Sequence, residues 1–204
     1  MMSKTHLAIG VASSVAVLGP QSDMALCLAV IGGALGAITP DIDTVRTERK
    51  ADALTAQMMA IGLTVLLLAA NFAARSEIST YVANHHTAAI LGGLAYLVLI
   101  AIAFLAPHRG FTHSLVAMTA FSWALYFVYP PVVPAYVNGY LSHLLVDLTN
   151  KREVPLLFPM KKGFCLRWFY ANRLANKLAF GIGTLSAVGL IAYRLAEIHH
   201  WIVW

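Results

Sequence analysis

The stretch Thr87–Ala106, TAAILGGLAYLVLIAIAFLA, decides the fold class of this chain. Its 20 residues include no charged side chain, and about 20 apolar residues in a helix span the hydrocarbon core of a bilayer. The whole composition agrees, because 59% of the residues are hydrophobic and 11% are charged, whereas soluble domains carry about 25% charged residues. The sequence therefore predicts an integral membrane protein and excludes a soluble globular enzyme and a disordered chain.

Further apolar segments on both sides of this stretch predict an all-α, polytopic helical membrane bundle. Seven segments are expected to be helical: Leu7–Leu18, Met24–Ile38, Ala56–Ala74, Thr87–Ala106, His113–Tyr129, Pro134–Leu148 and Leu174–Leu195. The first two flank Gly19-Pro20 and are each short for a complete crossing, so they form either tilted helices or a re-entrant hairpin. We expect a single domain, 1–204, with about 5–7 transmembrane helices.

The basic residues are distributed unevenly between the two ends of these segments. When the chain is threaded through all seven, 12 of the 14 Lys and Arg residues fall on the side of the N-terminus, and Arg75 and Arg194 fall on the other. Lys and Arg concentrate in the cytoplasmic loops of membrane proteins. The N-terminus is therefore predicted to be cytoplasmic, in a multi-pass arrangement.

Histidine and aspartate residues form four groups that an apolar bundle does not explain. They are His6, the pair Asp41 and Asp43, the segment His108–His113 (HRGFTH), and the pair His143 and Asp147. In the threaded chain every group lies at the cytoplasmic face, although the segments were drawn from hydropathy alone. Ionisable residues inside a membrane protein are costly and usually functional, so this convergence predicts a site at that face.

Imidazole and carboxylate groups in this arrangement suit a divalent metal. His143 and Asp147 are four residues apart, which places both on one face of a helix. Such a pair either binds a metal or forms a hydrogen bond that packs helices. Asp41 and Asp43 follow Pro40; one could bind metal while the other takes a proton from water, and the sequence does not rank them. A turn that leaves the membrane is the alternative interpretation of this pair.

The turn before His113–Tyr129 contains a cation and a predicted helix start. Thr112 is expected to be the N-cap, with His113 in the first turn of the helix. Arg109 is expected to bind the negative charge of a substrate, and a positive charge that anchors a cytoplasmic loop is the alternative. The expected catalytic residues are Asp41, Asp43 and Arg109. The expected metal ligands are His6, Asp41, His108, His113, His143 and Asp147.

Residues 149–173 are basic and interleaved with aromatic side chains. This composition predicts an interfacial cytoplasmic segment that contacts anionic membrane lipids. Single-stranded nucleic acid is bound by similar residue types, but specific nucleic-acid binding is not expected. The pairs His85-His86 and His199-His200 fall at the opposite face and are expected to be non-catalytic.

These motifs resemble those of the YdjM-like family of bacterial inner-membrane proteins. The resemblance is carried by PDID at 40–43, HRGFTHS at 108–114, GYLSHLLVDLT at 139–149 and VPLLFP at 154–159. It implies a membrane-bound metal-dependent hydrolase in the bacterial inner membrane, and some family members are LexA-regulated, under DNA-damage (SOS) control. The order His, Asp, His, His, Asp is also similar to the ligand order of zinc-dependent phospholipase C and related nucleases, all-helical enzymes that act on phosphodiesters.

Three functions remain open at this point. The first is hydrolysis of a phosphoester or lipid-linked substrate, with one or two divalent ions that activate water and polarise the substrate; zinc is expected first, and manganese or iron are the alternatives. The second is divalent-metal transport, because intramembrane His and Asp often mark ion pathways. The third is a non-enzymatic membrane scaffold whose polar groups only pack helices. The substrate and the oligomeric state do not follow from the sequence.

Overall fold

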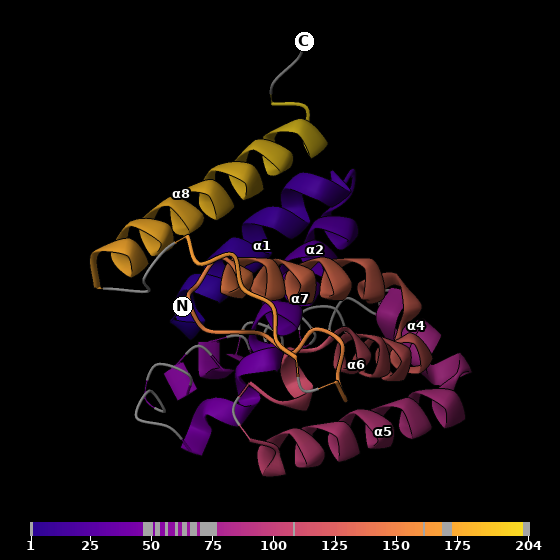
Figure 1. Ribbon diagram of the computed structural model, residues 1–204. Coiled ribbons are helices and arrows are strands. Elements are labelled where there is room, and N and C mark those ends of the chain that lie inside the picture. The colour runs from indigo at the N-terminus through magenta and orange to yellow at the C-terminus, as the bar shows by residue number, and fades with distance from the viewer. Residues whose placement is uncertain are drawn as a thin grey trace.

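The computed structural model describes residues 2–46, 51, 54–55, 57–59, 61–62, 65, 69, 77–107, 109–160, 162–168 and 173–201. Within these residues the protein is an all-α bundle, as predicted, and the pairing that occurs outside helices is an isolated bridge between Val154 and Phe164. Figure 1 shows the helices packed side by side with α8 along one flank. The predicted helix Ala56–Ala74 lies largely outside the described residues.

The first two helices form a tight hairpin. Helix α1 spans Ser3–Leu18 and ends at Gly19, whose φ of 52° is the left-handed conformation that closes a helix. Helix α2 spans Asp23–Ile38 and starts at Ser22, whose hydroxyl accepts a hydrogen bond from the Ala25 amide. The 3₁₀ helix η1, Thr39–Arg46, continues α2 directly. The apolar stretch Asp23–Asp43 thereby reaches 21 residues, long enough to cross a membrane.

Helix α2 is the central element of the bundle. It packs against α1 and against α7 (Val133–Leu148), and α1 also contacts α7 and α8 (Arg173–Ile198). The close approach depends on small residues, as in other membrane helix pairs. A Cβ on Gly36 would lie against the backbone carbonyl of Tyr136, and one on Gly139 would lie against that of Gly33. Helix α2 could not approach α7 so closely with side chains at these positions.

The remaining elements surround this centre. They are α4 (Glu77–Asn84), α5 (His86–Leu105), η2 (Phe111–His113), α6 (Leu115–Val128) and η3 (Pro130–Val132). Three segments of the described chain are long and apolar enough to cross a membrane: Asp23–Asp43, His86–Leu105 and Leu174–Ile198. Their surroundings differ, because 78% of the first segment is buried inside the protein and only 11% of each of the other two. Helices α5 and α8 therefore present apolar side chains outward, where a bilayer would cover them.

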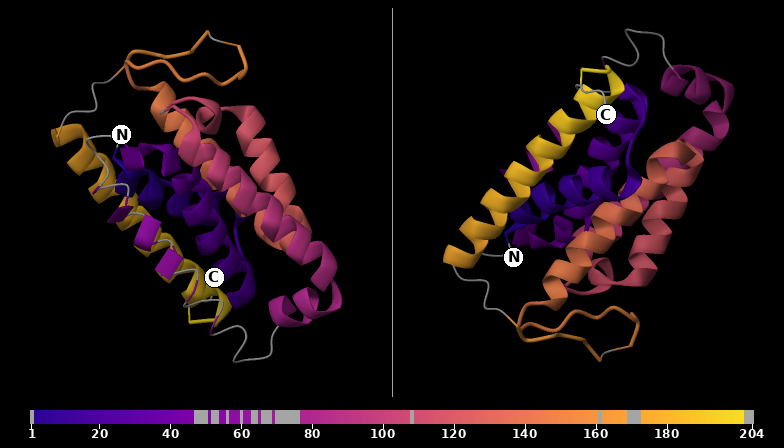
Figure 2. Two further views of the ribbon diagram at one scale, coloured as in Figure 1. Left: turned by 90° about the horizontal axis from the view of Figure 1, so that it is seen from below. Right: turned by 90° about the horizontal axis from the view of Figure 1, so that it is seen from above.

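The start of α1 and the end of α8 lie at opposite ends of the bundle. In Figure 2 the start of α1 and the extended segment that follows α7, coloured orange, lie at one end, and the C-terminal end of α8 lies at the other. The antiparallel course brings the start of α1, the end of α2, the start of α6 and the end of α7 to the same end. These are the places where the sequence carries its His and Asp groups.

Candidate functional site

The structure brings five of the predicted metal ligands into one buried cluster. They are His6, Asp41, His113, His143 and Asp147, each exposed by no more than 6%. His6 comes from the first turns of α1, Asp41 from η1, His113 from η2, and the last two from α7. Their ligand atoms form two overlapping groups within 4.8 Å, one of His6, Asp41 and His143 and one of His113, His143 and Asp147. His108, the sixth predicted ligand, lies outside the described residues.

His143 is held in the orientation of a metal ligand. Its Nδ1 lies 2.7 Å from the carbonyl oxygen of Ala37. A carbonyl only accepts, so Nδ1 donates this hydrogen bond and the lone pair of the neutral ring is on Nε2. Nε2 is buried, has no hydrogen-bond partner in the described part of the chain, and lies 3.8 Å from Oδ1 of Asp41. Two lone pairs thus face each other, an arrangement that a cation between them would stabilise.

The two carboxylates of the PDID motif occupy different positions. Oδ1 of Asp41 lies 3.8 Å from Nε2 of both His113 and His143, and its Oδ2 accepts a 2.6 Å hydrogen bond from the Ser3 hydroxyl. Asp43 lies on the other side of the His113 ring, with Oδ2 3.6 Å from Nδ1. A carboxylate behind a histidine fixes the tautomer and orientation of the ring. The geometry therefore distinguishes two carboxylates that the sequence left equivalent.

Arg109 joins three parts of the site. Its backbone amide donates to Oδ2 of Asp43 at 3.0 Å, and its guanidinium donates to Oδ2 of Asp147 at 2.7 Å and to the carbonyl of Arg152 at 3.0 Å. The backbone has a φ of 60°, which costs a non-glycine residue about 1 kcal/mol. The hydrogen bonds to both carboxylates offset this strain. Arg109 therefore holds η2 against η1 and α7 in addition to bringing a cation to the edge of the cluster.

The prediction that Thr112 caps the next helix was wrong. Helix α6 begins at Leu115, and its N-cap is Ser114, whose hydroxyl accepts from the Ala117 amide at 3.1 Å. Residues 111–113 form a 3₁₀ turn instead, in which the Thr112 hydroxyl donates to Oδ2 of Asp43 at 2.8 Å. Ser114 has the extended backbone that an N-cap adopts, with φ −129° and ψ 158°, whereas Thr112 lies inside the 3₁₀ turn.

Two supporting residues were missed by the sequence analysis. Ser3 donates to Asp41, and the Tyr140 hydroxyl donates to the carbonyl of Thr112. The spacing in the sequence could have indicated both residues. Each lies three residues before a cluster histidine in the same helix, and therefore on the same helix face. Serine and tyrosine are too common at such positions to be selected without the fold.

The donor set fits a divalent ion. Ligand atoms about 2.0–2.2 Å from a common ion are separated from one another by about 3–4 Å. The cluster shows such separations: 3.4 Å between Nε2 of His6 and Oδ1 of Asp147, and 3.7 Å between Nε2 of His113 and Oδ2 of Asp147. Three buried carboxylates, Asp41, Asp43 and Asp147, lie together in this part of the protein. Buried negative charge is costly, and a divalent cation would help to balance it.

The other described histidines do not join the cluster. His85, His86, His199 and His200 are exposed. Nε2 of His199 lies 3.2 Å from Oδ1 of Asp23, and these side chains are 43% and 63% exposed. The described histidines therefore form the two expected sets, one in the buried cluster and one outside it.

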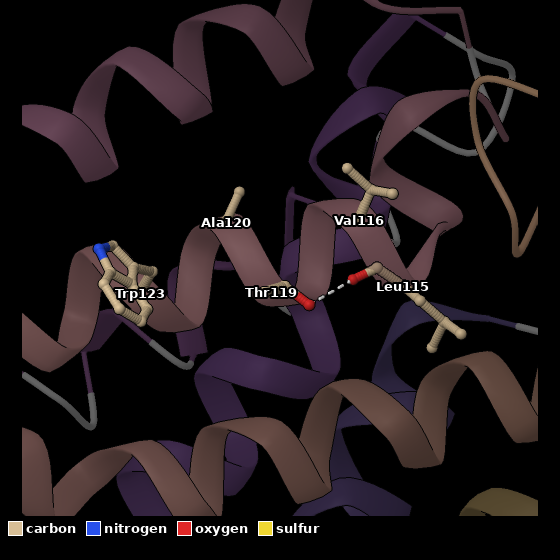
Figure 3. A pocket seen from close by; sticks show the side chains of 5 residues that line it. All are labelled: Leu115, Val116, Thr119, Ala120 and Trp123. Atoms are coloured by element: carbon tan, nitrogen blue, oxygen red, sulfur yellow. Dashed lines mark hydrogen bonds between the residues drawn. The ribbon is translucent and has the colours of Figure 1, made fainter.

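An apolar pocket on α6 includes none of the residues of the His–Asp cluster. Figure 3 shows its lining, which consists of Leu115, Val116, Thr119, Ala120 and Trp123. The Thr119 hydroxyl is already bonded to the carbonyl of Leu115 at 2.9 Å. No side chain in this lining is titratable, so the pocket offers no acid, base or metal ligand.

Fold and cluster together define a helical membrane protein with a buried His–Asp site at one end of its bundle. Sequence comparison specifies the family: the model of the YdjM inner membrane protein family matches residues 1–203, and the chain belongs to this family. It is also 44% identical over 66 residues to inner membrane protein YdjM from Escherichia coli (strain K12) and from Shigella flexneri. Each alignment covers 29% of this chain and 34% of the relative, so the chain spans about a third of the length of these curated relatives. No solved structure matches.

Proposed function

We propose that this inner-membrane protein is a metal-dependent hydrolase that acts on a phosphoester, with a lipid-linked phosphoester as the favoured substrate. The observation that supports this is the convergence of three histidines and two aspartates, all buried, from four separate elements of the bundle. Helix packing alone does not require such a set, because apolar side chains pack helices at lower cost than buried carboxylates. The proposal assigns the set to one or two divalent ions, zinc before manganese or iron.

The residues take different roles in this proposal. His6, Asp41, His113, His143 and Asp147 would hold the metal, which supplies Lewis acidity and a water of lowered pKa when bound. Asp43 orients His113, because it lies behind the ring and already accepts from the Thr112 hydroxyl. Arg109, whose side chain is 13% exposed, would exchange its bond to Asp147 for the charge of a phosphoryl group.

The position of the cluster favours a substrate that resides in the membrane. It lies at one end of an apolar bundle, and α5 and α8, the outward-facing helices, extend away from that end. A lipid-linked phosphoester reaches such a place by lateral diffusion. With the N-terminus assigned to the cytoplasm from the basic residues, the site would face the cytoplasmic leaflet. Thiol labelling of single-cysteine variants in intact cells tests this orientation.

Hydrolysis by the purified protein tests the proposal. Wild-type protein in nanodiscs, loaded with Zn²⁺ or Mn²⁺, is incubated with a panel of phospholipids and soluble phosphodiesters, and released phosphate-containing product is measured. We expect turnover that falls at least a hundredfold with His143→Ala and is unchanged with His199→Ala. No product from any member of the panel would contradict the substrate class. Metal flux into proteoliposomes that is lost with His143→Ala would support transport in place of hydrolysis.

A further inference from the structure

The segment after α7 forms a flap anchored beside the His–Asp cluster. We use the term flap for residues 151–160 and 162–168. The isolated bridge between Val154 and Phe164 joins its two extended arms, and the Leu166 amide donates to the carbonyl of Leu148, directly after Asp147, at 2.7 Å. The Leu115 amide, two residues after His113, donates to the carbonyl of Leu156 at 3.0 Å. The flap is thus attached to the ends of two elements that carry cluster residues, and Arg109 binds it as well.

The returning arm of the flap presents its large apolar side chains outward. Phe164 and Leu166 are 41% and 51% exposed, and Cys165 between them is half-buried, as expected where alternate residues of an extended segment point to the same side. The extended course ends at Arg167, whose φ is 57°, and both Arg167 and the next residue, Trp168, are exposed, Trp168 by 67%. In water, large apolar side chains would be turned inward. The outward apolar side chains of this arm therefore need an apolar surrounding.

The turn of the flap also exposes large apolar side chains. Leu157, Phe158 and Met160 are 45%, 38% and 58% exposed. Together with the returning arm, the flap exposes six large apolar side chains within 18 residues, Lys151 to Trp168. Val154 alone among its large apolar residues is fully buried in the bundle. Exposed apolar side chains that cluster in this way mark an interaction surface.

The charged side chains of the flap are predominantly basic. Lys151, Arg152, Lys162 and Arg167 are exposed, and Glu153 is the acidic residue in the described part of the flap. Cations beside exposed aromatic and aliphatic groups fit the interface of an anionic bilayer, where the basic groups meet phosphates and the apolar groups enter the acyl region. A second copy of the same flap would bring like charges together, which disfavours self-association as its cover.

We propose that the flap binds anionic phospholipid, lying in the interface with its outward face inserted below the headgroups. The exposed apolar face, the surrounding cations and the attachment to an integral membrane bundle all match this one partner. The flap also borders the cluster through Leu115 and Leu148. Anionic phospholipid held there lies next to the site that would hydrolyse a phosphoester; this consequence, unlike the lipid binding itself, rests on the proposed function.

Fluorescence quenching of Trp168 tests the proposal. Trp123, Trp201 and Trp204 are replaced by Phe in the full-length protein, which leaves Trp168 as the reporter. The protein is placed in nanodiscs of phosphatidylcholine alone or mixed with phosphatidylglycerol, with bromine on the upper acyl chain as the quencher. We expect quenching of Trp168 by brominated lipid to be about twice as strong in the anionic nanodiscs, with little quenching by aqueous iodide.

A matched pair of charge variants separates the flap from the rest of this end of the protein. Lys151→Gln with Lys162→Gln is expected to reduce quenching in anionic nanodiscs to the level in phosphatidylcholine, whereas Lys4→Gln with Lys177→Gln leaves it unchanged. Strong iodide quenching of Trp168 in both nanodiscs would overturn the proposal, as would equal effects of the two double variants. Neither outcome involves metal or turnover, so failure here is distinguishable from failure of the proposed hydrolase.

Discussion

Both ends of the bundle carry histidine and aspartate, but only one end buries them. At one end His6, His113 and His143 are at most 1% exposed and lie among Asp41, Asp43 and Asp147. At the other end His199 pairs with Asp23, and these side chains are 43% and 63% exposed. The residue types are the same, so they do not by themselves define a site. Burial and additional fixed partners make the difference.

Backbone groups also orient the buried residues. Among the described contacts, no backbone group orients the side chains of the exposed pair, His199 and Asp23. The carbonyl of Ala37 fixes the ring of His143, and the amide of Arg109 holds Asp43. Oriented donors and acceptors in a low-dielectric interior interact strongly. An exposed His–Asp pair in water contributes little by comparison.

The largest expected effect of a single change is loss of the Asp147 carboxylate. Asp147→Ala leaves the guanidinium of Arg109 and Nε2 of His6 without this partner inside the protein. We expect the free energy of unfolding to fall by about 3–5 kcal/mol, measured by chemical denaturation in detergent. The matched change at the other end, Asp23→Ala, is expected to cost about 0–1 kcal/mol. Similar losses of unfolding free energy for the two variants would contradict the contrast between the buried and the exposed end.

A somewhat smaller effect is expected where the buried end depends on close helix contact. A Cβ on Gly36 would meet the carbonyl of Tyr136, whereas nothing lies within 4 Å of a Cβ on Gly93. Gly36→Ala is expected to lower the free energy of unfolding by about 1–3 kcal/mol. Gly93→Ala, on the outward face of α5, is expected to be neutral or to stabilise by up to about 1 kcal/mol. A stabilising Gly36→Ala would mean that α2 and α7 are farther apart than described.

A change at Asp43 is expected to affect metal binding rather than the fold, because it alters the orientation of a ligand and removes none. Asp43→Asn keeps the shape of the side chain and removes its charge behind His113. We expect metal affinity to fall about 10–100-fold, with the helix content unchanged by circular dichroism. Calorimetric titration of the metal-free protein with Zn²⁺ measures this. Complete loss of Zn²⁺ binding would instead mean that Asp43 is a direct metal ligand. An unchanged affinity would mean that Asp43 only stabilises the turn that contains Thr112.

Hydropathy was sufficient to predict the bundle, because runs such as Thr87–Ala106 have few stable alternatives to a membrane helix. Threading also predicted that His6, Asp41, His113, His143 and Asp147 lie at one end, since antiparallel helices return to the same ends. Their distances were not predictable, because these depend on how closely α2 packs against α7.

Local capping was less predictable than the bundle. Thr112 and Ser114 are both good N-caps by residue type, and the sequence offered no way to choose between them. The backbone decides, because Thr112 lies inside the 3₁₀ turn η2 whereas Ser114 is extended. The Thr112 hydroxyl ties this turn to Asp43, a residue 69 positions away along the chain. The different positions of Asp41 and Asp43 were not predictable either, because they depend on which nitrogen of the His113 ring each carboxylate approaches.

Metal content of the purified protein tests the central claim most directly. Wild type, the cluster variant His113→Ala with Asp147→Ala, and the opposite-end variant His199→Ala with Asp23→Ala are purified from cells grown with added zinc and analysed by elemental mass spectrometry, with circular dichroism to confirm equal helix content. We predict about one or two divalent ions per chain in the wild type and in the opposite-end variant, and none in the cluster variant. Equal metal content in all three, or none in the wild type, would contradict the assignment of the buried cluster to a metal.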